Sequence, residues 1–255
     1  MFWTKYHVYT LLPAFIVEII AAIIIGKALK NKSDKVKMIP IQIVTIILLA
    51  LEVAKQIYGI ATGYDTYWIP LHFCSLFLYF MPLASFYFGK YKNQARVLAA
   101  VISACLFFFM AIYPNLIYSG EAIVSAGKFL TGKGGWFIDF HSVIFHMIAL
   151  FSFFLFATLD VLEFKTKKDM VLIWVAFAIY CVIVGPLSQI IDTNFNNFVR
   201  CNAPFLEDVR LKLVESLSWG GQTIYVVMIS IGTIIVPTIS YFAIRGAKLI
   251  CKKII

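Results

Sequence analysis

A histidine and a cysteine stand two residues apart at the start of an apolar stretch, YWIPLHFCSLFLYFMPLASFYF, which runs from position 67 to 88. A cysteine thiolate is a good nucleophile, and it forms in apolar surroundings only beside a base or a cation. In an α-helix His72 would lie about 200° around the axis from Cys74, on a different face. The pattern therefore predicts that the base for Cys74 comes from another segment.

Two further histidines lie in the segment DFHSVIFHMIALFSFFLF. As a helix that enters the membrane from the same side as Cys74, this segment would place His146 about 7–8 Å deeper than His141 and about 140° around from it. We predict His146 as the general base for Cys74, and His141 as a residue that contacts the substrate or supports the base. The alternative is that Cys74 and His146 are two buried side chains with no functional relation.

The three histidines suit a metal site poorly. No two of His72, His141 and His146 are three or four residues apart, and the chain has no CxxC motif. Metal sites built on helices usually need such spacings. We therefore expect no metal and no cofactor.

The composition places this chemistry in a membrane. Apolar residues are 62% of the chain and charged residues 14%, with a mean hydropathy of +0.89. In a soluble domain about 45–50% of the residues are apolar and about 25% are charged. The net charge of +9 lies in the connectors between apolar stretches rather than in a patch for nucleic acid. Membrane lipids are therefore the expected partners, and the oligomeric state is left open.

Stretches of about 20 apolar residues are long enough to cross a bilayer as helices. They predict an all-α integral membrane protein, a single domain over 1–255 that forms a bundle of about seven transmembrane helices. The predicted spans are roughly 8–28, 38–59, 68–88, 95–117, 136–159, 170–191 and 222–244.

The basic residues alternate between the two sides of these spans. One side carries 15 Lys and Arg, in the connectors 27–37, 89–96 and 160–169 and in the tail from Arg245; the other side carries 6. The positive-inside rule then predicts an external N-terminus and a cytoplasmic C-terminus. The polar connector 192–221 would be external, as a lid or re-entrant loop rather than a free linker.

Once oriented, the spans place most ionisable groups in the outer half of the membrane. Glu52, Lys55 and Gln56 lie in the outer half of the second span, near the depth of the cysteine and histidines. Asn194 and Asn197 lie in the external connector. Such groups are costly in a membrane, about 2.5–3.5 kcal/mol each, and usually mark function. We predict that they bind substrate or support the catalytic pair, although Glu52 and Lys55 can also neutralise each other.

Three segments carry a family resemblance: PLHFCSL from position 70, the two-histidine helix DFHSVIFHMIALFSFFLF, and the turn DTNFNNFVRCNAPFL. Together they cover roughly 65–210 and resemble the YwaF-like family of integral membrane proteins, which is related to transmembrane protein 164, an ether-phospholipid acyltransferase. The resemblance implies a multi-helix fold in a bacterial plasma membrane. It also implies that Cys74 is the acyl-accepting nucleophile and His146 the general base.

The residues and the resemblance favour a lipid acyltransferase or lipid-ester hydrolase that acts in the outer half of the membrane. A small-molecule transporter or binding subunit is the alternative, with a polar path lined by Glu18, Glu52, Lys55 and His72. Against it, the inner halves of the spans lack matching polar groups. A seven-span receptor is a third class, but the short connectors leave no room for a signalling domain.

Overall fold

The computed structural model describes residues 3–255, and all their regular structure is helical, which confirms the predicted all-α class. The α-helices are α1 (Lys5–Leu29), α2 (Asp34–Thr62), α3 (Phe77–Phe86), α4 (Lys92–Ile112), α5 (Gly120–Leu130), α6 (Phe137–Thr158), α7 (Thr166–Ile190), α8 (Pro204–Leu217) and α9 (Trp219–Ile254). Short 3₁₀ turns η1 (Thr66–Trp68), η2 (Phe73–Leu76), η3 (Pro114–Leu116) and η4 (Phe195–Asn197) lie between them.

Six of these helices, α1, α2, α4, α6, α7 and α9, are long and apolar enough to cross a membrane. They confirm a multi-pass membrane protein, but the described residues hold six such helices rather than the seven predicted. The difference lies at 68–88, where only the ten residues of α3 are α-helical. Pro70 lacks an N–H and disfavours helical geometry in the residue before it, and Ile69 is extended (φ −58°, ψ 131°).

The broken helix changes the geometry around the cysteine. His72 is also extended (φ −64°, ψ 156°) and precedes η2, the 3₁₀ turn that carries Cys74. The sequence argument that put these two side chains on opposite faces assumed a continuous α-helix, so its premise is wrong. In this extended geometry the two side chains need not lie on different faces.

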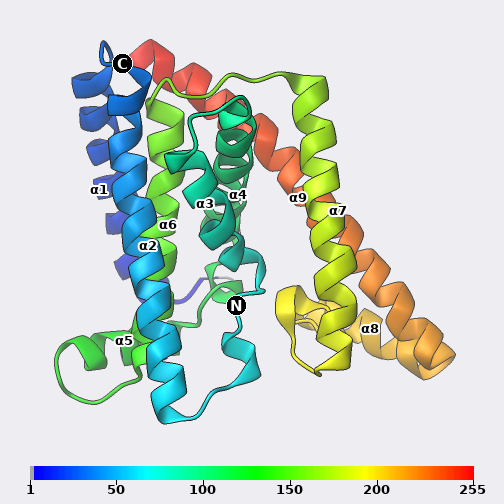
Figure 1. Ribbon diagram of the computed structural model, residues 1–255. Coiled ribbons are helices and arrows are strands. Elements are labelled where there is room, and N and C mark those ends of the chain that lie inside the picture. The colour runs from blue at the N-terminus through cyan, green and yellow to red at the C-terminus, as the bar shows by residue number, and fades with distance from the viewer. Residues whose placement is uncertain (1–2) are drawn as a thin grey trace.

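The helices form a bundle with α4 at its centre (Figure 1). One side is built from α1, α2 and α6, the other from α7 and α9, and α3 packs against α4 and α2. Ala99, Ala100 and Ala104 are fully buried, so the small side chains of α4 allow close helix packing. Ser103 on α4 and Ser152 on α6 share a hydrogen bond of 2.7 Å, which satisfies both hydroxyls in the apolar core.

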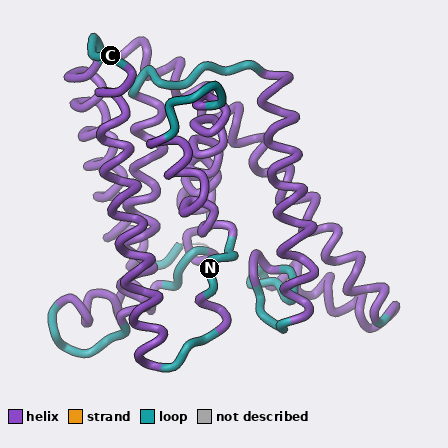
Figure 2. The backbone as a smooth tube through the Cα atoms, viewed as in Figure 1, coloured by secondary structure: helices purple, strands orange, loops and turns teal. Residues whose placement is uncertain are grey.

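The connectors separate into two groups at the ends of the bundle (Figure 2). The α1–α2, α3–α4 and α6–α7 connectors and the C-terminal end of α9 lie at one end, here called the basic end (Figure 1). These are the segments to which the sequence assigned 15 Lys and Arg. The shared end agrees with the predicted alternation, and the direction across the membrane stays a prediction.

An ion pair between a buried arginine and a partly exposed aspartate joins three segments at the basic end. Arg96 is 2% exposed and donates to both carboxylate oxygens of Asp34, at 2.7 and 2.9 Å. It also donates to the carbonyl oxygen of Val161 at 3.2 Å. This bidentate arrangement is among the stronger polar contacts that a protein makes, and it fixes the starts of α2 and α4 against the α6–α7 connector.

The segment between α7 and α9, residues 191–218, is folded and not a free linker, as predicted. It contains η4 and α8, and α8 packs along α9. All non-glycine residues with positive φ among residues 3–255 lie in it: Asp192, Asn196, Asn197 and Ser218. Left-handed backbone is costly for such residues and persists where surrounding contacts hold it. This segment is called the α7–α9 connector below.

The sharp turn from α8 into α9 depends on Gly221. A Cβ at this position would lie 2.0 Å from the Leu213 carbonyl oxygen, whereas one at Gly220 would meet only the Leu217 Cβ at 3.8 Å. We predict that Gly221→Ala displaces α8 and costs on the order of 1–3 kcal/mol of stability. Limited trypsin digestion after Lys212 would measure this, with Gly220→Ala as the control. Equal cleavage of the two variants would contradict the prediction.

Candidate functional site

A cavity of about 540 Å³ lies between the α1–α6 part of the bundle and the pair α8–α9. From Tyr225 to Val236 on α9 it extends about 16 Å along the helix, at 1.5 Å per residue. Its deeper wall is apolar and includes Ile102, Leu106 and Met228. The residues singled out in the sequence that line it are Glu52, Lys55, His72, Cys74, His141, His146, Asn194 and Asn197.

Cys74 lies in η2 at the edge of this cavity. Its side chain is half-buried, and it is a free thiol. Because the 3₁₀ turn interrupts the helix, this segment lies against the α7–α9 connector: the hydroxyls of Thr66 and Thr193 share a hydrogen bond of 2.8 Å. The cysteine is therefore held between two irregular segments rather than on a regular helix face.

His146 projects from α6 into the same cavity. Its Nδ1 lies 2.7 Å from the Ser142 carbonyl oxygen, and a carbonyl can only accept, so Nδ1 carries the proton. Nε2 has no hydrogen-bond partner among residues 3–255. The neutral ring is therefore the tautomer with its proton on Nδ1 and a lone pair on Nε2. A general base needs such a lone pair on the nitrogen that faces the substrate or nucleophile.

Glu52, Lys55 and His141 form a buried polar cluster on another wall. The ammonium of Lys55 lies 2.8 Å from Glu52 Oε1, and both side chains are 11% exposed; the two residues thus form the ion pair that their spacing allows. Glu52 Oε2 is 3.9 Å from His141 Nε2, which has no hydrogen-bond partner among the described residues. The cluster therefore keeps one unsatisfied ring nitrogen beside the cavity.

Gln56 supports this cluster from outside the cavity wall. Its Nε2 donates to Glu52 Oε1 at 2.7 Å and to the Trp68 carbonyl oxygen at 2.9 Å. Its Oε1 accepts from the Tyr64 hydroxyl at 2.5 Å. Gln56 thus orients the Glu52 carboxylate and ties α2 to η1.

His72 shares the cavity with Cys74, contrary to the expectation from helix geometry. Its Nε2 lies 2.8 Å from the Tyr67 carbonyl oxygen, to which it must donate. Its ring packs edge-on against Phe195, with 5.1 Å between the ring centroids. His72 therefore joins the cysteine segment to the α7–α9 connector.

Two asparagines of the α7–α9 connector that line the cavity, Asn194 and Asn197, use their side-chain oxygens as acceptors. The Asn194 side-chain oxygen accepts the backbone N–H groups of Val199 and Arg200, both at 3.1 Å. The Asn197 side-chain oxygen accepts from the backbone N–H of Asn202 at 3.2 Å. Neither side-chain NH₂ group has a hydrogen-bond partner among residues 3–255, so both are available to a ligand. Asn196, in contrast, already donates to the Thr233 hydroxyl at 2.8 Å.

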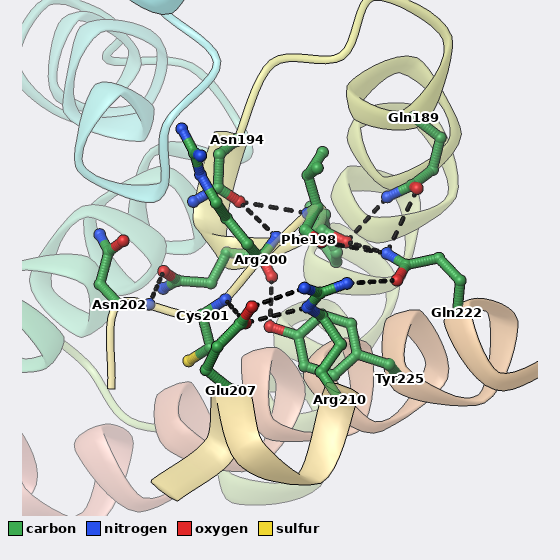
Figure 3. Close-up of polar contacts among 12 residues, drawn as sticks. Gln189, Asn194, Phe198, Arg200, Cys201, Asn202, Glu207, Arg210, Gln222 and Tyr225 are labelled. Carbon is green, nitrogen blue, oxygen red and sulfur yellow. Dashed lines mark hydrogen bonds and ion pairs between the residues drawn. The ribbon is translucent and has the colours of Figure 1, made fainter. Parts of the chain in front are cut away.

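A polar network fastens the first part of this connector, residues 194–202, to its helix α8 and to α9 (Figure 3). Glu207 accepts the backbone N–H of Cys201 at 2.7 Å and pairs with the Arg210 guanidinium at 2.5 Å. Gln222 on α9 donates to the carbonyl oxygens of Phe198 and Val199. The hydrogen bond from Arg210 lowers the pKa of Glu207, so this carboxylate is charged at neutral pH.

Sequence reasoning missed the wall that α9 contributes. Tyr225, Ile229, Thr233 and Val236 line the cavity at spacings of three and four residues, the pattern of one helix face. This signal was hidden because β-branched apolar residues occupy every face of α9. Glu18, which the transporter alternative placed on the path, is not among the residues that line the cavity.

The Glu207 contacts predict that the stability of the connector's folded arrangement depends on pH. Because the folded pKa is lowered, the stabilisation is present above the unfolded pKa of about 4.3 and is lost as the pH falls through the folded pKa. We expect Glu207→Gln to speed hydrogen exchange at the Cys201 amide at neutral pH, by an amount that corresponds to about 1 kcal/mol.

The matched control is Glu215→Gln, because Glu215 is exposed on the same helix. The difference between wild type and Glu207→Gln should shrink at acid pH, where the wild-type carboxylate is neutral as well. Exchange at Cys201 that is equally slow in all three proteins would show that Glu207 does not hold the connector.

Comparison with known families agrees with this architecture. The chain matches the family model described as the TMEM164 family over residues 2–241, which extends well beyond the three segments that carry the sequence resemblance. The match names the relative of the YwaF-like family and not that family itself. No curated protein and no solved structure gives a significant match. Because the family model covers nearly the whole chain, this protein is a multi-pass membrane protein of the TMEM164 family.

Proposed function

We propose that the protein is a lipid acyltransferase or lipid-ester hydrolase of a bacterial plasma membrane, with Cys74 as nucleophile and His146 as general base. The observation that carries this proposal is that both side chains line one cavity, while His146 uses Nδ1 on a backbone carbonyl and leaves Nε2 free. The resemblance noted in the sequence supports the same pairing.

In the first half-reaction, His146 Nε2 takes the proton of the Cys74 thiol, and the sulfur attacks the ester carbonyl carbon of a lipid. The tetrahedral intermediate collapses, the ester C–O bond breaks, and the proton on His146 passes to the departing alkoxide. The products are a lipid alcohol and an acyl-thioester on Cys74. A positioned general base contributes about 10²–10⁴ to the rate of such a step.

The second half-reaction decides between transfer and hydrolysis. The hydroxyl of a lysolipid, or water, gives its proton to His146 and attacks the thioester carbonyl carbon. The C–S bond breaks, and the sulfur recovers the proton from His146. The acyl group leaves as a new ester or as a free acid, and the enzyme returns to its starting state.

Two features of the cavity wall suit the charges that develop. The free side-chain amides of Asn194 and Asn197 are candidate donors to the oxyanion of the tetrahedral intermediate. The Lys55 ammonium lies in the same cavity and favours a thiolate electrostatically. Glu52 offsets part of this effect because it pairs with Lys55.

The shape and lining of the cavity favour a lipid substrate. Polar residues gather beside η1, η2 and the α7–α9 connector. Along the roughly 16 Å of α9 that line the cavity, the lining from Met228 to Val236 is apolar apart from Thr233. A molecule with a polar ester region and an acyl chain would fill both parts. A small polar solute would leave the apolar wall without contacts.

The proposal predicts that Cys74→Ala abolishes acyl transfer from a radiolabelled phospholipid and removes the hydroxylamine-sensitive acyl label on the protein. His146→Gln should lower the rate on the order of 10³-fold, since the thiol then lacks its base. Thin-layer chromatography of the lipids and autoradiography of the protein would measure the two effects.

Cys201→Ala is the matched control, because this second thiol lines the same cavity and should keep both the label and the activity. His72→Gln distinguishes the two histidines and should retain most of the rate. A protein labelled equally with and without Cys74 would refute the cysteine mechanism, and a larger loss in His72→Gln than in His146→Gln would reassign the base.

A second candidate function is the binding or transport of a small solute. The observation that favours it is the buried Glu52–Lys55 pair beside the unsatisfied His141 Nε2, since paired intramembrane charges often mark solute or proton paths. Uptake into proteoliposomes that is lost in Lys55→Met but kept in Cys74→Ala would establish this function. We expect no such uptake.

A further inference from the structure

A second, smaller cavity of about 230 Å³ lies at the basic end, far along the bundle from the candidate site. Its walls come from α1, α2, the end of α6 and the last turns of α9. Four lysines line it: Lys30, Lys37, Lys248 and Lys252. Asp160 is the one acidic side chain among its described lining residues. The cavity therefore carries a clear excess of positive charge.

Two of the four lysines are already engaged. Lys248 lies 2.8 Å from Asp160, and Lys30 donates to the backbone oxygen of Ile255 at 2.8 Å. The side chains of Lys37 and Lys252 make no hydrogen bond or ion pair with any of residues 3–255. Their ammonium groups are thus available to an incoming anion.

The pKa of Asp160 responds to the positive charges around it. A hydrogen bond from Lys248 lowers the pKa of this carboxyl, and the charges of Lys37 and Lys252 lower it further. The positions of the three lysines therefore place their charges around one point. One carboxylate cannot neutralise them, so the space between them attracts a further anion.

Part of the cavity lining is apolar. Gly26, Leu29, Ala157 and Leu159 line it together with the lysines, close to where α1 and α6 end. A free phosphate ion would gain nothing from these walls, whereas the glycerol and first acyl carbons of a lipid would cover them. Basic pockets between transmembrane helices bind anionic headgroups in this way.

We propose that the basic-end cavity binds the phosphate of an anionic glycerophospholipid, with Lys37 and Lys252 as its principal donors. Lys30 and Lys248 contribute charge from the walls. This site is separate from the proposed catalytic cavity, so it does not depend on whether the chain is an acyltransferase.

Native mass spectrometry of the detergent-solubilised protein tests this with three additions: phosphatidylglycerol, phosphatidylcholine and inorganic phosphate. We expect phosphatidylglycerol to be retained and to raise the melting temperature, with little effect of the other two. Lys37→Gln with Lys252→Gln should weaken phosphatidylglycerol binding roughly 30-fold, from about fivefold per lysine. Asp160→Asn should strengthen it.

The matched control is Lys167→Gln with Lys168→Gln. These exposed lysines lie at the same end of the bundle but outside the cavity, so this variant should bind phosphatidylglycerol as wild type does. Equal losses in the two double variants would show attraction by general surface charge and overturn the proposal. Binding of inorganic phosphate as tight as that of phosphatidylglycerol would overturn the assignment to a lipid.

Discussion

Backbone groups that leave helical geometry at membrane depth must find partners within the protein, because lipid offers none. Two segments of residues 3–255 that leave α-helical geometry line the main cavity, residues 63–76 and the α7–α9 connector. They meet where the hydroxyls of Thr66 and Thr193 share a hydrogen bond, and the Leu71 carbonyl oxygen of the first segment accepts a hydrogen bond from the Tyr180 hydroxyl on α7. In a continuous helix such a carbonyl oxygen would accept from the backbone of the same helix. Together with α2, α4, α6 and α9, the two irregular segments form the wall of the cavity.

Buried charge is treated differently at the two ends of the bundle. Arg96 and Asp34 form a bidentate pair that fastens three segments, and neither residue lines either of the two described cavities. Glu52 and Lys55 pair along one helix, next to open space. A buried ion pair is weak evidence for stability, since desolvation offsets much of its attraction. The Arg96–Asp34 pair therefore has a structural role, whereas the Glu52–Lys55 pair can contact a ligand in the cavity.

Much of the fold could be predicted from apolar length, because a bilayer sets the length of a spanning helix. The prediction of a transmembrane helix over 68–88 was wrong because a count of apolar residues ignores backbone geometry. Pro70 and the extended Ile69 interrupt the helix before Cys74. The clustering of polar residues was predictable from their shared depth along the spans. The side-chain amides left free on the connector were not, since they depend on which backbone N–H groups the asparagine oxygens accept.

The composition of the cavity wall also sets an order of assembly. His72, Cys74 and His146 all precede α7, while the asparagines and the α9 face come from the last quarter of the sequence. Chains are synthesised and generally folded from the N-terminus. The thiol and the imidazoles are thus inserted while one wall of their cavity is still absent, open to the surrounding lipid. Only when α9 follows does its face, from Tyr225 to Val236, complete the wall opposite them.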